Sequence, residues 1–306
     1  MASWRKSTSK QYNTYLTRWV AYCREQDIHV GEATIQDGLG FLTSLHKQGL
    51  GFSAINTARS ALSSVMTLGD KTTFGEHPLV VRFLKGIFEL KPSMPRYSVV
   101  WDVGTVFEYF LSMPVLEDLT LKQLTLKLTM LLALTTAQRC QTLACLDIEL
   151  MQVMPDRIRF TLKEKLKTTR PGSHLEPIEV TAFPQEPRLC PVRHIEQYIT
   201  RTQNHRQSSK LLLSFIKPYK QVTTSSIGRW IKSTLSEAGI DEEQFSAHSS
   251  RTASSSYGLQ SGLTIQDILK AGGWTRAGTF AKHYNKPISS NFGTHILNHF
   301  NHTNSD

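Results

Sequence analysis

The sequence is poor in cysteine and has neither a long apolar run nor an apolar segment near its N-terminus. Its four cysteines show none of the paired spacings that zinc sites use, and we expect no disulfide bonds among Cys23, Cys140, Cys145 and Cys190. No apolar run approaches the length of a membrane-spanning helix, and the first residues do not resemble a secretion signal. We therefore expect a protein of a reducing compartment with no membrane partner.

Acidic residues are outnumbered by basic ones, which gives a net charge of +10 over 306 residues. The sequence pI is about 9.5. Such a balance favours a polyanionic partner, more often nucleic acid than membrane, although a basic protein without such a partner remains an alternative. The length is sufficient for two domains.

Apolar residues at helical spacing predict four helices in residues 1–90. The first covers about residues 8–27, and Thr34, Ser53 and Pro78 open the other three. Their polar faces hold six basic residues, each of which could be merely solvated: Lys6, Lys10, Arg18, Arg59, Arg82 and Lys85. Residues 91–100 contain two prolines and predict an extended linker.

A second domain is predicted over residues 101–290. It has helices around 103–112 and 122–136, and residues 157–162 alternate as a strand whose partner is residues 176–181. Leu211 to Phe215 predicts a short strand or extended run. The fold class is therefore mainly α with a small β-sheet. The tail, 291–306, is polar except for four residues that could form a short apolar helix face: Phe292, Ile296, Leu297 and Phe300.

The stretch from Phe245 to Tyr284 concentrates reactive side chains. His248 and Arg251 are three residues apart, which places both on one face of a helix, and Ser246 is the predicted N-cap. A helix N-terminus beside a histidine and an arginine favours an anion such as phosphate. Thr264 caps a second helix, which Gly272-Gly273 ends just before Trp274.

Arg139 lies in a very apolar neighbourhood formed by Leu131, Leu132, Leu134, Leu143 and Leu146. A charge in such surroundings needs a partner or an anionic ligand. Either Asp147 or Glu149 could be that partner, so the sequence leaves both possibilities open.

The motif H-x-x-R, followed by A-G-G-W and a tyrosine ten residues after the tryptophan, resembles the second active-site box of the tyrosine recombinases, or phage-type integrases. The A-G-G-W-T wording is Cre-like, and the wider wording resembles the transposon-borne recombinases of DIRS-like and Crypton elements. Residues 135–143 resemble the first box. Two positions depart from the pattern: the tryptophan-to-tyrosine interval is nine in many members, and Thr142 stands where the family usually has an acidic residue.

The resemblance implies a catalytic set of Arg139, Lys167, His248, Arg251, Trp274 and Tyr284. Tyr284 is expected to attack DNA phosphorus and form a 3′-phosphotyrosine. Lys167 is expected to protonate the leaving 5′-oxygen, with Lys163 and Lys165 as alternatives on the same hairpin. Two arginines can neutralise the phosphate, so we expect no metal and no cofactor.

The resemblance further implies a site-specific DNA recombinase or integrase that works as a homo-tetramer on double-stranded DNA. Residues 1–90 would be its core-binding, DNA-clamping domain, residues 101–290 its catalytic domain, and the tail would dock on a neighbouring subunit or on its own domain. A type IB topoisomerase-like relaxing enzyme and an inactive DNA-binding derivative are the alternatives. The expected location is the nucleus for a eukaryotic host and the cytoplasm otherwise.

Overall fold

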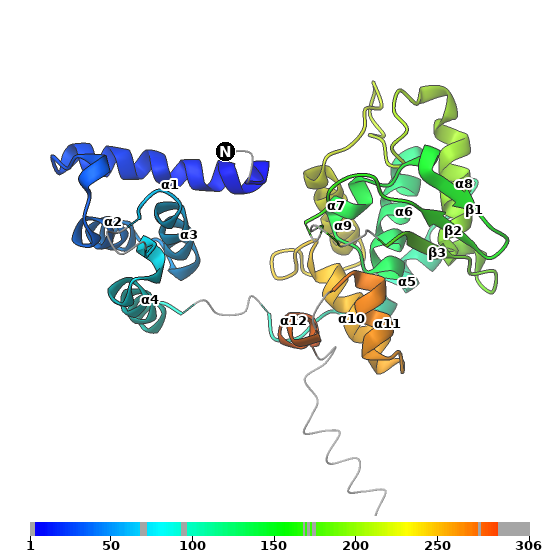
Figure 1. Ribbon diagram of the computed structural model, residues 1–306. Helices are drawn as coiled ribbons and strands as arrows, with labels where there is room; N and C mark the ends of the chain where they lie inside the picture. Colours follow the sequence, from blue (N-terminus) through cyan, green and yellow to red (C-terminus); the bar gives the residue numbers. More distant parts are fainter. Residues whose placement is uncertain are drawn as a thin grey trace, which may run out of the picture. The chain divides into compact units, whose positions relative to one another are not determined.

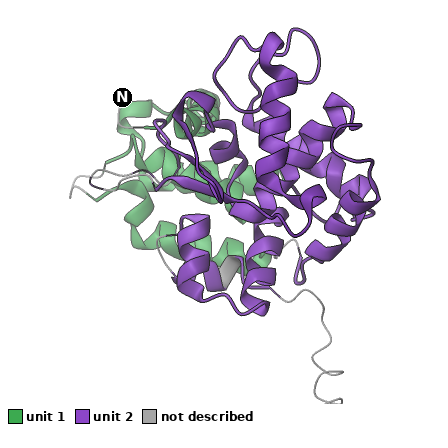
Figure 2. Ribbon diagram, turned by 90° about the vertical axis from the view of Figure 1, so that its right-hand side faces the viewer, with its two compact units in different colours: residues 1–95 green, residues 96–306 purple. Residues whose placement is uncertain are grey.

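The computed structural model describes residues 4–67, 72–92, 97–167, 169, 172, 176–274 and 277–286. The chain divides into two compact units, Met1–Pro95 and Arg96–Asp306 (Figure 2). The division falls inside the segment predicted as a linker. The C-terminal apolar residues Phe292, Ile296, Leu297 and Phe300 lie outside the described residues.

Unit 1 consists of four α-helices (Figure 1), namely α1 (Lys6–Glu25), α2 (Ile35–Lys47), α3 (Phe52–Ser63) and α4 (Pro78–Leu90). Thr34 caps α2 as predicted: its side chain accepts from the Asp37 N–H, and Asp37 accepts from the Thr34 N–H in return. Pro78 occupies the first turn of α4, where its missing N–H costs nothing. The helices enclose a core that includes Trp19, Phe41, Leu42, Ile55 and Leu62.

Unit 2 is organised around one buried helix, α6 (Leu121–Thr136), which Thr120 caps together with Gln123. Helix α6 packs against α8 (Pro191–Thr202), α9 (Thr224–Glu237), α10 (Ser249–Gln260) and the sheet. Because neighbours surround it, even Lys127 is buried. Its Nζ donates to the Phe110 carbonyl at 2.9 Å, and burial lowers its pKa to about 8.

A three-stranded antiparallel sheet completes the core of unit 2. The strands β1 (Met151–Val153), β2 (Arg157–Phe160) and β3 (Ile178–Thr181) follow one another in order across the sheet. Ile158 pairs with Val180, and both are buried. The predicted pairing of β2 with β3 is present. Strand β1 was not predicted, because its three residues are too few to show alternation.

The remaining helices of unit 2 are α5 (Val103–Ser112), α7 (Cys140–Ala144), α11 (Ile265–Gly272) and α12 (Ala277–His283). Leu211 to Phe215, predicted as a short strand or extended run, forms no strand and has one isolated bridge, between Leu213 and Gln221. No helix among the described residues is long and apolar enough to cross a membrane. The fold class predicted from sequence, mainly α with a small sheet, is confirmed.

Candidate active site

The first turn of α10 differs from the prediction in one respect. His248, not Ser246, is the N-cap residue, and Ser246 lies in the turn that precedes the helix. The Ser246 carbonyl accepts hydrogen bonds from the N–H and the hydroxyl of Ser249, at 2.8 and 2.7 Å. Since His248 already has right-handed helical dihedrals, it still shares a face with Arg251.

Arg251 is almost completely buried, with 1% of its surface exposed. Its guanidinium donates to the Ala137 carbonyl at 2.8 Å and to the Gly272 carbonyl at 2.5 Å. It also lies 3.6 Å from the centre of the Trp274 ring. Burial lowers the Arg251 pKa to about 9, which still leaves the side chain charged at neutral pH.

Arg139 is held by a sharp turn at the end of α6. Ala137 has a left-handed backbone with φ of 49°, which ends the helix and exposes its carbonyl to Arg251. The next residue, Gln138, donates from Nε2 to the Ala271 carbonyl at 2.6 Å. This turn therefore links α6 to α10 and α11, and Arg139 follows it as the N-cap of α7.

Asp147, one of the two acidic partners considered for Arg139, is engaged elsewhere. Asp147 accepts from Ser209 at 2.9 Å and pairs with Lys210 at 3.3 Å. Within the part of the chain that the structure describes, the half-buried Arg139 side chain forms no ion pair or hydrogen bond. Its charge is therefore available to a ligand.

Tyr284 lies just beyond α12 and reaches back to α10. Its N–H donates to the Phe280 carbonyl at 2.8 Å, and its hydroxyl lies 2.9 Å from Nε2 of His248. The Tyr284 ring meets the Trp274 ring edge-on, with centroids 4.8 Å apart. The tenth position after Trp274 thus carries its hydroxyl into the arginine cluster.

Both the burial of His248 and the charges around it keep the ring neutral. Burial is the main cause of its lowered pKa, and the positive charges of Arg251, Arg139 and Lys167 lower it further. The residue as a whole nevertheless remains exposed to solvent. Lys163, Lys165 and Lys167 are all exposed. Because the charge of Lys167 helps to lower the pKa of His248, the β2–β3 connection brings this lysine toward the site.

A cleft of about 1000 Å³ opens beside these groups. Its lining includes Arg139, Thr142, Arg159 of β2, Lys270 and Trp274. Thr142 is buried and brings no carboxylate to the position where the family usually has one. The indole N–H of Trp274 is buried and has no hydrogen-bond partner among the residues described.

Sequence reasoning did not identify the groups that hold this cluster in place. The backbone carbonyls of Ala137 and Gly272 accept from Arg251, and the side-chain amide of Gln138 holds the turn that precedes Arg139. The Ser256 hydroxyl donates to the backbone at Tyr284. Neither composition nor spacing marks such residues, because their partners lie as many as 133 positions away in the sequence.

Solved structures that resemble this chain share its fold at low sequence identity. The Tn1549 transposon integrase in complex with transposon right end DNA gives a TM-score of 0.59 at 11% identity, covering 92% of this chain and 90% of that one. XerH bound to its difH substrate gives a TM-score of 0.58 at 13% identity, covering 90% of this chain and 76% of that one. A lambda integrase dimer bound to a COC′ core site gives a TM-score of 0.56 at 13% identity, covering 94% of this chain and 91% of that one. A search of curated proteins found no match.

These structures define the fold as that of a tyrosine recombinase, an enzyme class that breaks and rejoins DNA strands. The chain belongs to the phage integrase family, whose model matches residues 113–290 and so covers more than half of it. The resemblance inferred from the two active-site boxes is confirmed at the level of the family.

Proposed function

We propose that this protein is a site-specific recombinase in which Tyr284 is the nucleophile. The observation that carries the proposal is the hydrogen bond between the Tyr284 hydroxyl and Nε2 of His248, 2.9 Å long, beside the buried guanidinium of Arg251. Three segments distant in sequence meet there: the end of α6, the start of α10 and the residue after α12.

The scissile phosphate binds between Arg139 and Arg251. An arginine has five N–H donors, and the two Arg251 donors that face protein carbonyls leave others for non-bridging oxygens. The Trp274 indole N–H adds a neutral donor from the same wall. One such donor to the developing charge is commonly worth ~10²–10³ in rate.

Cleavage then follows from the positions of the proton carriers. The neutral His248 accepts the phenolic proton as the Tyr284 oxygen attacks phosphorus. A 3′-phosphotyrosine bond forms, the bond to the 5′-oxygen breaks, and Lys167 gives that oxygen a proton. Phenol ionises near pH ~10 and therefore leaves readily when the 5′-hydroxyl attacks in the reverse step. The covalent link conserves the bond energy, so rejoining needs no nucleotide.

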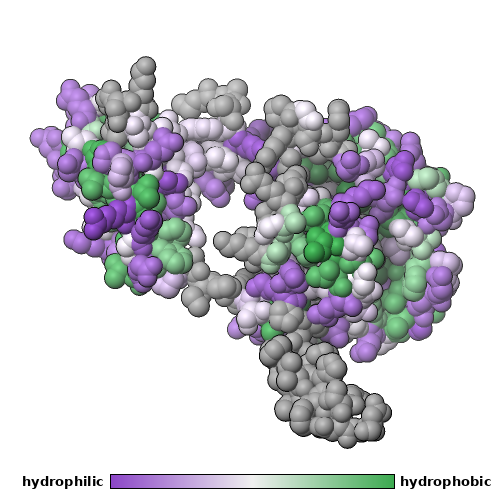
Figure 3. Space-filling view, turned by 60° about the horizontal axis from the view of Figure 1, so that its bottom comes forward, coloured by the Kyte–Doolittle hydropathy of each residue, from purple (hydrophilic) through white to green (hydrophobic). Residues whose placement is uncertain are grey.

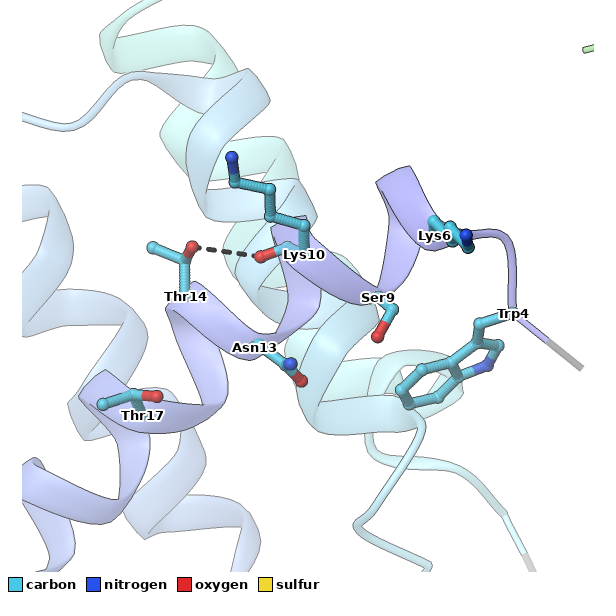
Figure 4. A pocket seen from close by; sticks show the side chains of 7 residues that line it. All are labelled: Trp4, Lys6, Ser9, Lys10, Asn13, Thr14 and Thr17. Atoms are coloured by element: carbon cyan, nitrogen blue, oxygen red, sulfur yellow. Dashed lines mark hydrogen bonds between the residues drawn. The ribbon is translucent and has the colours of Figure 1, made fainter. Parts of the chain in front are cut away.

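Double-stranded DNA is the proposed partner, and α1 offers unit 1 a surface for it. Figure 4 shows the polar face of this helix, on which Lys6, Lys10, Asn13 and Thr17 line a shallow depression beside Trp4. Lysines contact phosphates, and asparagine and threonine can hydrogen-bond to phosphates or to base edges. Hydrophilic side chains also cover much of the visible surface of both units (Figure 3).

We further propose that recombination proceeds on a homo-tetramer. A lambda integrase tetramer bound to a Holliday junction resembles this chain, with a TM-score of 0.54 at 12% identity. Helix α4 exposes apolar residues that a monomer leaves open to water, namely Leu79, Val81, Phe88 and Leu90. A relaxing enzyme working as a monomer would not need this surface.

The decisive experiment replaces Tyr284 by phenylalanine. Wild-type protein incubated with a nicked suicide DNA substrate should form a covalent adduct that maps to the peptide containing Tyr284. Tyr284→Phe keeps the ring contacts with Trp274 and should bind DNA with unchanged affinity but form no adduct. An adduct on another residue, or one formed by Tyr284→Phe, would contradict the proposal.

A further inference from the structure

One buried serine holds the segment that carries Tyr284. Ser256 is 1% exposed on α10, and its hydroxyl donates to the Tyr284 carbonyl at 2.8 Å. The same oxygen accepts a hydrogen bond from the Lys286 N–H at 3.1 Å. A single side chain therefore pairs with the backbone on both sides of Asn285.

A second contact holds the same segment from the opposite direction. The Lys286 ammonium donates to the Tyr97 carbonyl and lies 4.6 Å from the centre of the Tyr97 ring. Tyr97 in turn packs against Phe245, with ring centroids 5.3 Å apart. Unit 2 begins at Arg96, so the contact between Lys286 and Tyr97 joins the Tyr284 segment to the first residues of that unit.

The helix that precedes Tyr284 does not fix this residue by itself. Helix α12 ends at His283, and the N–H groups of Tyr284 and Asn285 both point to the Phe280 carbonyl, at 2.8 and 3.1 Å. Such shared bonds at a helix end constrain the chain weakly, because the last turn frays. The direction of the Tyr284 side chain therefore depends on what holds the residues after it.

We propose that Ser256 and Lys286 form a latch that positions the nucleophile for attack. Ser256 fixes the Tyr284 carbonyl, Lys286 fixes the chain two residues on, and together they direct the phenol to His248. The interval between Trp274 and Tyr284 is one residue longer than in many family members. The latch tolerates this extra residue, because contacts with α10 fix the position of Tyr284 independently of the length of α12. This inference rests on the proposed function, in which Tyr284 is the nucleophile.

The test measures single-turnover cleavage of suicide DNA by Ser256→Ala. Removing one hydroxyl loses both hydrogen bonds that orient the Tyr284 segment, and we expect the rate constant to fall about tenfold, which corresponds to ~1.4 kcal/mol. DNA affinity and the final fraction of DNA cleaved should stay at the wild-type level. A purely structural role would lower the final fraction through loss of folded protein and leave the rate constant unchanged, which would overturn the latch.

Ser255→Ala is the matched control. Ser255 is also buried on α10, but its hydroxyl bonds to the carbonyls of Arg251 and Thr252 within its own helix. We expect this variant to lose a similar amount of stability and to keep the wild-type rate constant. Equal slowing by both serine variants would overturn the proposal, because it would assign the effect to α10 as a whole.

Two further arms keep the outcome decisive. Lys286→Met removes the contact with Tyr97 without touching the buried serine; it should slow cleavage two- to tenfold, and Lys286→Arg should restore most of the rate. If Ser256→Ala does not fold, a wild-type rate in Lys286→Met overturns the latch. If Tyr284→Phe forms no adduct while both latch variants cleave normally, the latch fails and the proposed function stands.

Discussion

Arg139 and Arg251 carry the same charge into the site but differ in what else they do. Arg251 is buried, is bonded to two carbonyls from different helix ends and covers the Trp274 ring. Arg139 is half-buried, and its side chain has no hydrogen bond or ion pair within the described ranges. Arg251 therefore supports the architecture in addition to its proposed role in binding substrate, whereas the proposed role of Arg139 is mainly substrate binding.

This difference predicts unequal effects on stability. Arg251→Ala leaves the Ala137 and Gly272 carbonyls unsatisfied, at a cost of ~1–3 kcal/mol for each buried group. We expect its free energy of unfolding to fall by about 3 kcal/mol, and that of Arg139→Ala by less than about 1 kcal/mol. Denaturant titration measures both, and a cleavage assay should find both variants inactive. Equal stabilities would show that the carbonyl contacts of Arg251 contribute little.

His248 predicts how cleavage depends on pH. Because its pKa lies below the ordinary value of about 6.5, the neutral ring, which is the proposed acceptor of the phenolic proton, persists into mildly acidic solution. We expect the single-turnover rate constant to fall only below that value as the ring becomes protonated. Glutamine in His248→Gln is polar but does not titrate. We therefore expect this variant to cleave more slowly and to show no fall in rate constant at acidic pH. A midpoint above 6.5 in the wild type would contradict the assigned electrostatics.

At the scale of elements, the connection between β2 and β3 carries the lysine proposed as the general acid. Lys163, Lys165 and Lys167 are all exposed on it, and the charge of Lys167 reaches His248. Glu164, between the first two, pairs with Lys210 at 2.5 Å and also accepts from the Cys145 thiol at 3.2 Å. The root of the connection is thus attached to the body of unit 2.

We expect Lys167→Ala to slow cleavage more than Lys163→Ala or Lys165→Ala. A 5′-phosphorothiolate substrate leaves without protonation and should restore the rate of the Lys167 variant, since only the acid step was lost. The two neighbouring variants serve as controls for the loss of one positive charge. Rescue of Lys165→Ala but not of Lys167→Ala would move the general acid to Lys165.

Local signals in the sequence predict most elements. Thr34 and Thr264 cap α2 and α11 because each side chain accepts from an N–H three residues on, which spacing alone reveals. Gly273 ends α11 in the left-handed conformation that glycine adopts readily. Where the outcome depends on tertiary contacts the sequence decides less: Ser246 lies before the cap, contrary to the prediction. For Leu211 to Phe215 the sequence left a short strand or an extended run open, and the structure has one isolated bridge and no strand.

The same limit applies to the site. Residue order and spacing predict which side chains carry the chemistry, because H-x-x-R and the tryptophan-to-tyrosine interval lie within one stretch. They do not predict the groups that orient those side chains. Ala137 and Ser256 are ordinary in sequence and acquire their roles from partners 114 and 28 residues away.

At the scale of the whole molecule, the charge of +10 predicts DNA binding that weakens steeply with salt. A protein that contacts ~6–10 phosphates loses ~10³–10⁵ in affinity between ~50 and ~200 mM salt. Titration of duplex DNA over that range should give a steep linear plot of log affinity against log salt. Lys6→Ala combined with Lys10→Ala should reduce the slope by about 2 if α1 contacts phosphates. A flat plot for the wild type would contradict a DNA-clamping role.

The burial of Arg251 has a consequence for the protein before it meets DNA. Its guanidinium lies among carbonyls and aromatic rings, and no carboxylate in the described ranges pairs with it. In the absence of DNA, the fold therefore contains a buried positive charge that no anion balances. In the proposed complex, a bound phosphate supplies that anion. We therefore expect DNA to stabilise the fold as well as to serve as substrate, and DNA at ~100 times its dissociation constant should add ~2.7 kcal/mol to the free energy of unfolding.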